Sequence, residues 1–133
     1  DFMTNSLDLG GHALGLAEAA LLVAATWAPA AADPVSFRED VFPILQLRCL
    51  ECHQPGGEGY EKSGFDMRTY ESLMKGARHG PMVVPGSIIE SNLLAMIDRR
   101  TSPELWMPHG KKQLSKCERQ TLRFWVAQGA RNN

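Results

Sequence analysis

The sequence has no excess of charge of either sign. Its 133 residues include 14 lysines and arginines and 15 aspartates and glutamates, for a formal net charge of −1. Proteins that bind nucleic acid usually have a basic surface, so the composition gives no reason to expect such a partner. The sequence also lacks a convincing strand pattern and any alternation of strands with helices. Its length is enough for one domain and hardly enough for two.

Basic residues are absent from the first 32 positions, where the only charged side chains are Asp1, Asp8 and Glu18. Residues 13–32, ALGLAEAALLVAATWAPAAA, are almost wholly apolar and long enough for a membrane anchor, although Glu18 would be costly in lipid. A secretory signal is the other interpretation, although it lacks a basic start. We predict an apolar N-terminal segment over 1–32, either a membrane anchor or an uncleaved signal. A domain over 33–133 then lies on the periplasmic side of the membrane.

One pentapeptide, Cys49-Leu50-Glu51-Cys52-His53, has the pattern Cys-x-x-Cys-His that attaches a covalent c-type haem. Two thiols three residues apart can form thioethers to the two vinyl groups along one porphyrin edge. The histidine that follows can then coordinate the iron through a neutral imidazole nitrogen. We therefore predict one covalent haem c, bound by Cys49, Cys52 and His53, with His53 as a metal ligand. In so small a domain, most of the core must be built against this cofactor.

Other kinds of site with a Cys-x-x-Cys pattern need additional sequence features, and this sequence lacks them. A redox-active cysteine pair usually lies in a strand–helix unit, and a four-ligand zinc site needs a second Cys/His pair at close spacing. The remaining candidates, Cys117, His79 and His109, are scattered along the chain. Both alternatives are therefore disfavoured.

Three Ser-x-x-Glu capping boxes predict helix starts, at Ser36, Ser87 and Ser115. Apolar residues at helical spacing follow each serine. The first helix leads into the haem motif. Because proline disrupts a helix interior, this helix is expected either to kink at Pro43 or to begin at Asp40, which places the proline in its first turn.

The remaining segments are predicted to be helical or irregular. The helix after Ser87 should end near Arg99-Arg100 and the last helix near Gln128, with a short helix over Tyr70–Lys75. Residues 54–59 read as a loop, whose backbone is expected to accept a hydrogen bond from the second ring nitrogen of His53. The result is an all-α domain of three to four helices wrapped around one covalent haem.

An electron carrier with low-spin iron needs a sixth ligand, for which Met and His are the usual choices. Met107 is preferred because it lies in a loop that can turn toward the iron, is stiffened by Pro108 and precedes a capped helix. Met82 is the second choice and His109 a competitor. The other candidates are Met67, Met74, Met96 and His79.

These motifs resemble those of the single-haem class I cytochromes c, and among them the short Planctomycete-type cytochrome c domains. The resemblance extends from about Val35 to Arg131. Besides the haem motif, its matching pieces are Val41-x-Pro43-Ile44-Leu45, Val84-Pro85-Gly86-Ser87, Ser91-x-Leu93-Leu94, Met107-Pro108, Leu114-Ser115 and Trp125-Val126-x-x-Gly129-Ala130.

The resemblance implies a distal ligand and a packing arrangement. In that family the methionine of a Met-Pro-Pro motif is the distal ligand, which corresponds to Met107. His109 replaces the second proline here, so a histidine ligand stays open. The family also packs its first and last helices crosswise, which corresponds to contacts of Phe37 and Val41 with Leu122 and Trp125.

We expect an electron-transfer protein rather than an enzyme. Its partner would be a redox protein or a membrane-associated respiratory or photosynthetic oxidoreductase complex. The alternative is a haem-based ligand binder or sensor with an open or weak sixth position. A basic cluster before and on the last helix could dock an acidic partner, although a solvated face is the commoner role: Lys111, Lys112, Lys116, Arg119 and Arg123.

Overall fold

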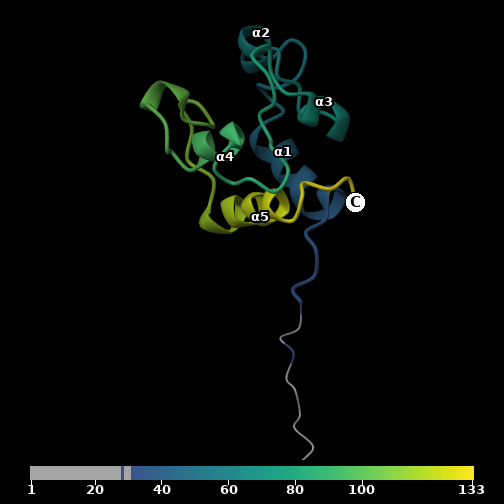
Figure 1. The fold of residues 1–133 in the computed structure, drawn as a ribbon. Helices are drawn as coiled ribbons and strands as arrows, with labels where there is room; N and C mark the ends of the chain where they lie inside the picture. The colour runs from purple at the N-terminus through teal and green to yellow at the C-terminus, as the bar shows by residue number, and fades with distance from the viewer. Residues whose placement is uncertain (1–27, 29–30) are drawn as a thin grey trace, which may run out of the picture. The chain divides into compact units, whose positions relative to one another are not determined.

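The structure is a computed structural model that describes residue 28 and residues 31–133 (Figure 1). Most of the predicted N-terminal segment 1–32, and with it the predicted anchor or signal, therefore lies outside the described residues. Within the described part, no helix combines the length and the apolar character needed to cross a membrane. Ala32–Asn133 form one compact unit.

The first helical segment changes from a π-helix to an α-helix just before Pro43. A π-helical turn, η1 (Phe37–Val41), continues into an α-helix, α1 (Phe42–Arg48), which has the proline in its first turn. The Ser36 hydroxyl accepts a hydrogen bond from the Glu39 amide at 3.1 Å, but the Ser36 amide donates to Asp40 at 2.8 Å instead of to Glu39. The helix thus begins after Ser36, not at Asp40. The wider π turn accommodates a proline that has no amide to donate.

Two short helices follow the haem motif. The predicted helix over 70–75 is confirmed as α3 (Tyr70–Lys75), which is capped by Thr69 and ends at Gly76. Its neighbour α2 (Glu58–Ser63) was not predicted, because a stretch with so many glycines reads as a loop.

The helix predicted to follow Ser87 begins four residues later, as α4 (Asn92–Ile97). The Ser87 hydroxyl accepts only the Glu90 amide, at 3.2 Å, and so closes a turn. The buried Ser91 hydroxyl accepts from the Val84 amide at 2.9 Å and donates to the Ser87 carbonyl at 2.7 Å. These bonds fix the preceding loop, and the helix starts only after Ser91.

The last helix agrees with its prediction. A single 3₁₀ turn, η2 (Pro103–Leu105), precedes α5 (Lys116–Ala127), whose N-terminus has the complete Ser115/Glu118 capping box. Apart from one isolated bridge between Ala77 and Gly80, residues 31–133 contain no β-structure. The all-α prediction is therefore confirmed for the part of the chain that the structure describes.

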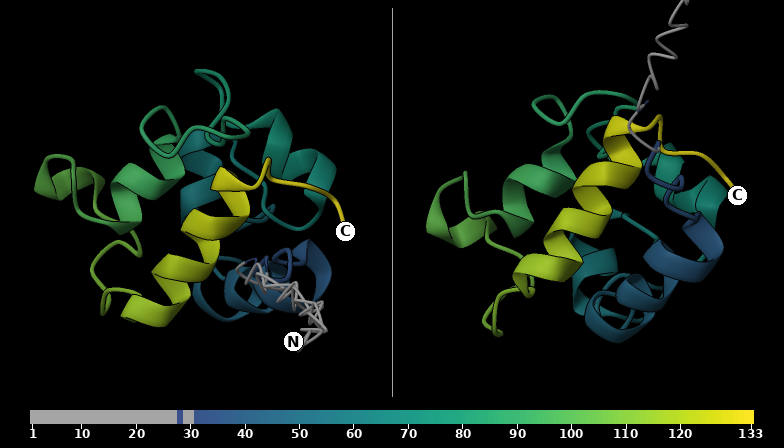
Figure 2. Two further views of the ribbon diagram at one scale, coloured as in Figure 1. Left: turned by 60° about the horizontal axis from the view of Figure 1, so that its bottom comes forward. Right: turned by 90° about the horizontal axis from the view of Figure 1, so that it is seen from below.

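The first and last helical segments contact each other, as the family resemblance implied (Figure 2). Their contact is aromatic: the rings of Phe37 and Trp125 are 5.6 Å apart between centroids, and the Tyr70 ring meets Phe37 edge-on at 5.3 Å. Such aromatic pairs add to the stabilisation that comes from burying their area. Val41 and Leu122 complete this part of the core and are almost fully buried.

The C-terminal residue is bonded to the start of η1. The Asn133 side chain accepts from the Phe37 amide at 2.9 Å and donates to the Val35 carbonyl at 3.2 Å. The Asn133 carbonyl also accepts from the Arg38 amide at 3.0 Å. These bonds satisfy amides at a helix N-terminus that have no partner within the helix, so the two ends of residues 35–133 meet.

Candidate haem-attachment site

The haem motif forms a helical turn that directly continues α1. Cys49 is the C-cap of that helix, and the His53 amide donates to the Cys49 carbonyl at 2.9 Å. Residues three and four apart on such a turn lie on the same face. The turn therefore brings together Cys49, Cys52 and His53, the three residues predicted from the motif. All three are half-buried, and neither cysteine is in a disulfide.

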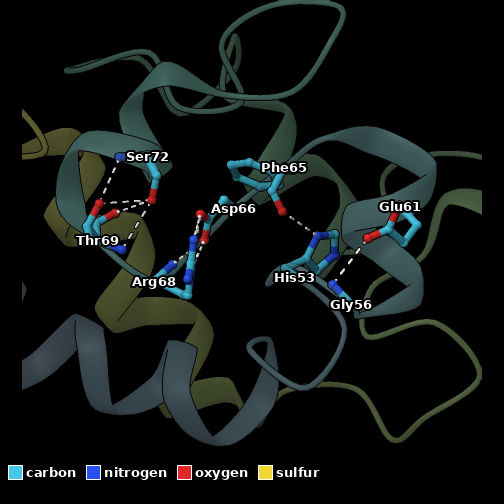
Figure 3. A network of polar contacts seen from close by, with 8 residues as sticks. All are labelled: His53, Gly56, Glu61, Phe65, Asp66, Arg68, Thr69 and Ser72. Carbon is cyan, nitrogen blue, oxygen red and sulfur yellow. Dashed lines mark hydrogen bonds and ion pairs between the residues drawn. The ribbon is translucent and has the colours of Figure 1, made fainter.

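The imidazole of His53 is oriented by the segment that follows α2. Its Nδ1 lies 3.2 Å from the Phe65 carbonyl oxygen, and the Phe65 ring meets the imidazole edge-on at 5.5 Å (Figure 3). The expected carbonyl thus comes from Phe65, not from residues 54–59. A carbonyl only accepts, so Nδ1 holds the proton and Nε2 keeps its lone pair. Burial lowers the pKa of His53, which favours the neutral form that binds metals.

The backbone around this histidine is held from two sides. The Met67 amide donates to the His53 carbonyl at 2.9 Å, and the Tyr60 amide donates to the Cys52 carbonyl at 2.8 Å. Met67 is itself buried in the core. The second bond explains why α2 forms, because it fixes the first turn of that helix against the motif.

Two glycines of this segment allow the close approach. A Cβ atom on Gly59 would lie 2.9 Å from Cε1 and 3.0 Å from Nε2 of His53, and one on Gly57 would lie 2.5 Å from the Cys52 carbonyl oxygen. Neither glycine has a positive φ, so close contact, not backbone conformation, is the constraint. The role of these two glycines could not be predicted from the sequence, where the only signal was the high glycine content after the motif.

We expect Gly59→Ala to reduce haem incorporation, because the added methyl group must displace the imidazole of His53. The measurement is the ratio of covalently bound haem to protein in the purified variant. Gly56→Ala is the control: it adds strain at a φ of +88° in the same loop but meets no atom within 4 Å. Equal haem ratios in the two variants would contradict the role assigned to Gly59.

Among the described residues, Cys49 and Cys52 have no neighbouring ligands that would complete a zinc site. Burial raises the pKa of Cys49 to about 12, so its thiol is less acidic than that of an ordinary exposed cysteine. Within residues 31–133, no group of three or more His, Cys, Asp or Glu side chains is arranged to hold a metal ion. Two cysteines and an oriented imidazole on one face of a helical turn instead fit a covalently attached haem.

The seven candidates for the distal position differ in exposure. Met67 is buried, and both His79 and His109 are exposed. Met96 is half-buried within α4. Three methionines are half-buried and pack against the hydrophobic core: Met74, Met82 and Met107.

Met107 belongs to a loop that is tied both to α4 and to the haem motif. Its amide faces the Met96 carbonyl oxygen at 3.3 Å. Farther along the loop, Arg48 donates to the Lys112 carbonyl at 2.8 Å, and the Lys111 ammonium pairs with Glu51 inside the motif. The fold thus brings the Met107–Lys112 segment next to Arg48 and Glu51, although Met107 lies 54 positions after His53 in the sequence.

The predicted basic cluster is partly neutralised within the domain. Arg119 and Arg123 both approach the half-buried Asp98, at 3.4 and 2.8 Å. The hydrogen bond from Lys111 lowers the pKa of Glu51. Lys112 and Lys116 remain exposed.

Comparison with known proteins identifies the domain. No curated protein matches the chain. A solved chain of Kuenenia stuttgartiensis hydrazine synthase is similar at 24% identity with a TM-score of 0.50; the match covers 72% of this chain but only 16% of that one. At this identity the likeness concerns the fold alone. The family model described as Planctomycete cytochrome C matches residues 49–109, which begin at the first cysteine of the motif and extend past Met107. The chain therefore contains a Planctomycete-type cytochrome c domain with a covalently bound c-type haem.

Proposed function

We propose that this chain is an electron-transfer protein, in which Cys49 and Cys52 attach one haem c and His53 and Met107 are the axial ligands of its iron. One observation carries the proposal: Phe65 fixes the ring of His53 so that Nε2 is the free, unprotonated nitrogen. A histidine oriented in this way is what a proximal haem ligand needs.

Met107 is the distal ligand that the packing best supports. Its side chain is half-buried against the core, and its loop is tied to the segment that contains the haem motif. His79 and His109 are exposed, which makes them poorer candidates for a position that water must not reach. Met82 is comparably buried but lies in a loop for which no such tie to the motif is found in the described residues.

The proposed activity follows from the two ligands. A c-type haem supplies a one-electron ferric–ferrous couple, and protein ligands on both sides leave no open position for a substrate. The protein's own residues then have three tasks: they attach the cofactor, exclude water from it and set its potential through the methionine. We further propose that the partner is a membrane-associated respiratory or photosynthetic oxidoreductase on the periplasmic side, which the apolar stretch over 13–32 supports.

The test is a reduced-minus-oxidised visible spectrum of the full chain, together with a haem stain after denaturing electrophoresis. We expect covalent haem, a sharp α-band on reduction and, in the oxidised form, the weak long-wavelength band that accompanies a methionine–iron bond. A low-spin spectrum without that band would reject Met107 in favour of a histidine. Rapid carbon monoxide binding by the reduced protein would favour a ligand binder or sensor.

A further inference from the structure

The loop that contains Met107 is separated from α1 by a cavity. This cavity, of about 220 Å³, is lined by Leu47 and Arg48 on one side and by Pro108, Lys111 and Lys112 on the other. Leu47 is 78% exposed, so little of its side chain is buried against the loop. Two polar contacts join the loop to α1 and to the haem motif that follows it.

Arg48 makes the contact that is best shielded from water. Its Nη2 donates to the Lys112 carbonyl at 2.8 Å, and its Nε lies 3.9 Å from a carboxylate oxygen of Glu118. The side chains of this ion pair are 24% and 23% exposed. Glu118 is itself fixed by the α5 capping box. The guanidinium of Arg48 thus joins α1, the Met107–Lys112 segment and the start of α5. Arg48 is also the residue immediately before Cys49.

The second contact, between the loop and the haem motif, is weaker. Lys111 pairs with Glu51, but their side chains are 51% and 80% exposed. Exposed ion pairs contribute little, because water and salt screen them and two flexible side chains must be ordered. Hydrogen bonds from a charged donor to a shielded carbonyl are among the stronger ones.

We propose that Arg48 is a positioning residue for the distal ligand: it holds the Met107–Lys112 segment against α1 and so keeps Met107 in place. This inference rests on the proposed function, in which Met107 is the distal ligand. The opposite side of the segment is tied to α4 through Met107 itself and through Gln113, which donates to the Ile97 carbonyl at 3.0 Å. Loss of Arg48 therefore frees one side of the loop while the other stays attached.

The test compares Arg48→Met with Lys111→Met in the haem-loaded full chain. Each variant removes one positive charge from the same cavity and keeps an unbranched side chain, so both share any direct electrostatic effect on the potential. Carbon monoxide can bind only after the distal ligand leaves, so its binding rate to the reduced protein reports the population of the open loop. We expect this rate to be at least about tenfold higher in Arg48→Met, since losing one charge-assisted hydrogen bond changes an opening equilibrium by about that factor.

Two further variants complete the experiment. Arg48→Lys should fall between wild type and Arg48→Met, because a single ammonium cannot reach both Lys112 and Glu118 as the guanidinium does. If Arg48→Met yields no haem-loaded protein, a wild-type rate in Arg48→Lys would overturn the proposal. Equal rates in Arg48→Met and Lys111→Met would do the same. Met107→Ala tests the ligand assignment independently of Arg48: if this variant keeps the methionine–iron band, Met107 is not the distal ligand.

Discussion

Replacing Met107 with alanine should lower the reduction potential of the haem and abolish the methionine–iron band of the oxidised protein. A thioether stabilises ferrous iron relative to a water or hydroxide ligand, so its loss favours the oxidised state. We expect a decrease on the order of 0.1 V, a modest part of the roughly 0.8 V that axial ligation spans. The vacated position should also make the reduced protein bind carbon monoxide rapidly. A redox titration and a carbon monoxide difference spectrum measure both effects.

Met82→Ala and Met74→Ala are the matched controls for this experiment. Both side chains are half-buried against the same core, so each variant removes a similar volume of apolar side chain. They should cost stability as large-to-small substitutions do, but they should leave the band and the potential close to those of wild type. A potential that falls in Met82→Ala and not in Met107→Ala would transfer the ligand assignment to Met82.

Replacing Trp125 with alanine should cost about 3–5 kcal/mol of folding free energy, as large-to-small changes of buried aromatic residues do. Trp125 is 1% exposed, and its ring packs against Phe37 and Tyr70. Its indole N–H donates to the Arg131 carbonyl at 2.9 Å, so the substitution also leaves that carbonyl without its partner. Small domains are stable by only about 5–15 kcal/mol in total. The loss should appear as a markedly lower denaturant midpoint, followed by far-ultraviolet circular dichroism of the haem-loaded protein.

Phe124→Ala provides the comparison for Trp125, because Phe124 is the adjacent residue of α5 and is 55% exposed. Surface substitutions of this kind usually change stability by less than about 0.5 kcal/mol. If both variants unfolded at the same denaturant concentration, the contact between the first and last helices would not be the main packing element of this domain.

The sequence predicted the parts of the fold that depend on local chemistry. Ser115 caps α5 with Glu118 as its reciprocal partner, and α3 ends at Gly76, because capping uses residues only three or four positions apart. The haem-attachment site could also be predicted from the sequence, since its pattern consists of five consecutive residues. The contact between Phe37 and Trp125 followed from the family resemblance and not from the spacing of the residues.

The predictions that failed concern features that depend on contacts between residues far apart in the sequence. Ser87 has the local pattern of a helix cap, but α4 begins only after Ser91, whose hydroxyl is bonded to Val84 and Ser87 in the preceding loop and does not cap the helix. The helix α2 has poor intrinsic propensity at Gly59, and it forms where the motif offers the Cys52 carbonyl to the Tyr60 amide. Similarly, Phe65 is 12 residues beyond His53, and no local pattern marks its carbonyl as the partner of the imidazole.

The bonds of Asn133 to Val35, Phe37 and Arg38 determine how this domain can be joined to other chains. Because Val35 and Asn133 lie close together, a longer polypeptide could continue from both positions, as insertion of a domain into another chain requires. A π-helical turn of five residues and an α-helix of seven residues separate this junction from Cys49. Fusion partners at either end would therefore share one side of the module, and the haem motif would stay at the far end of the first helical segment.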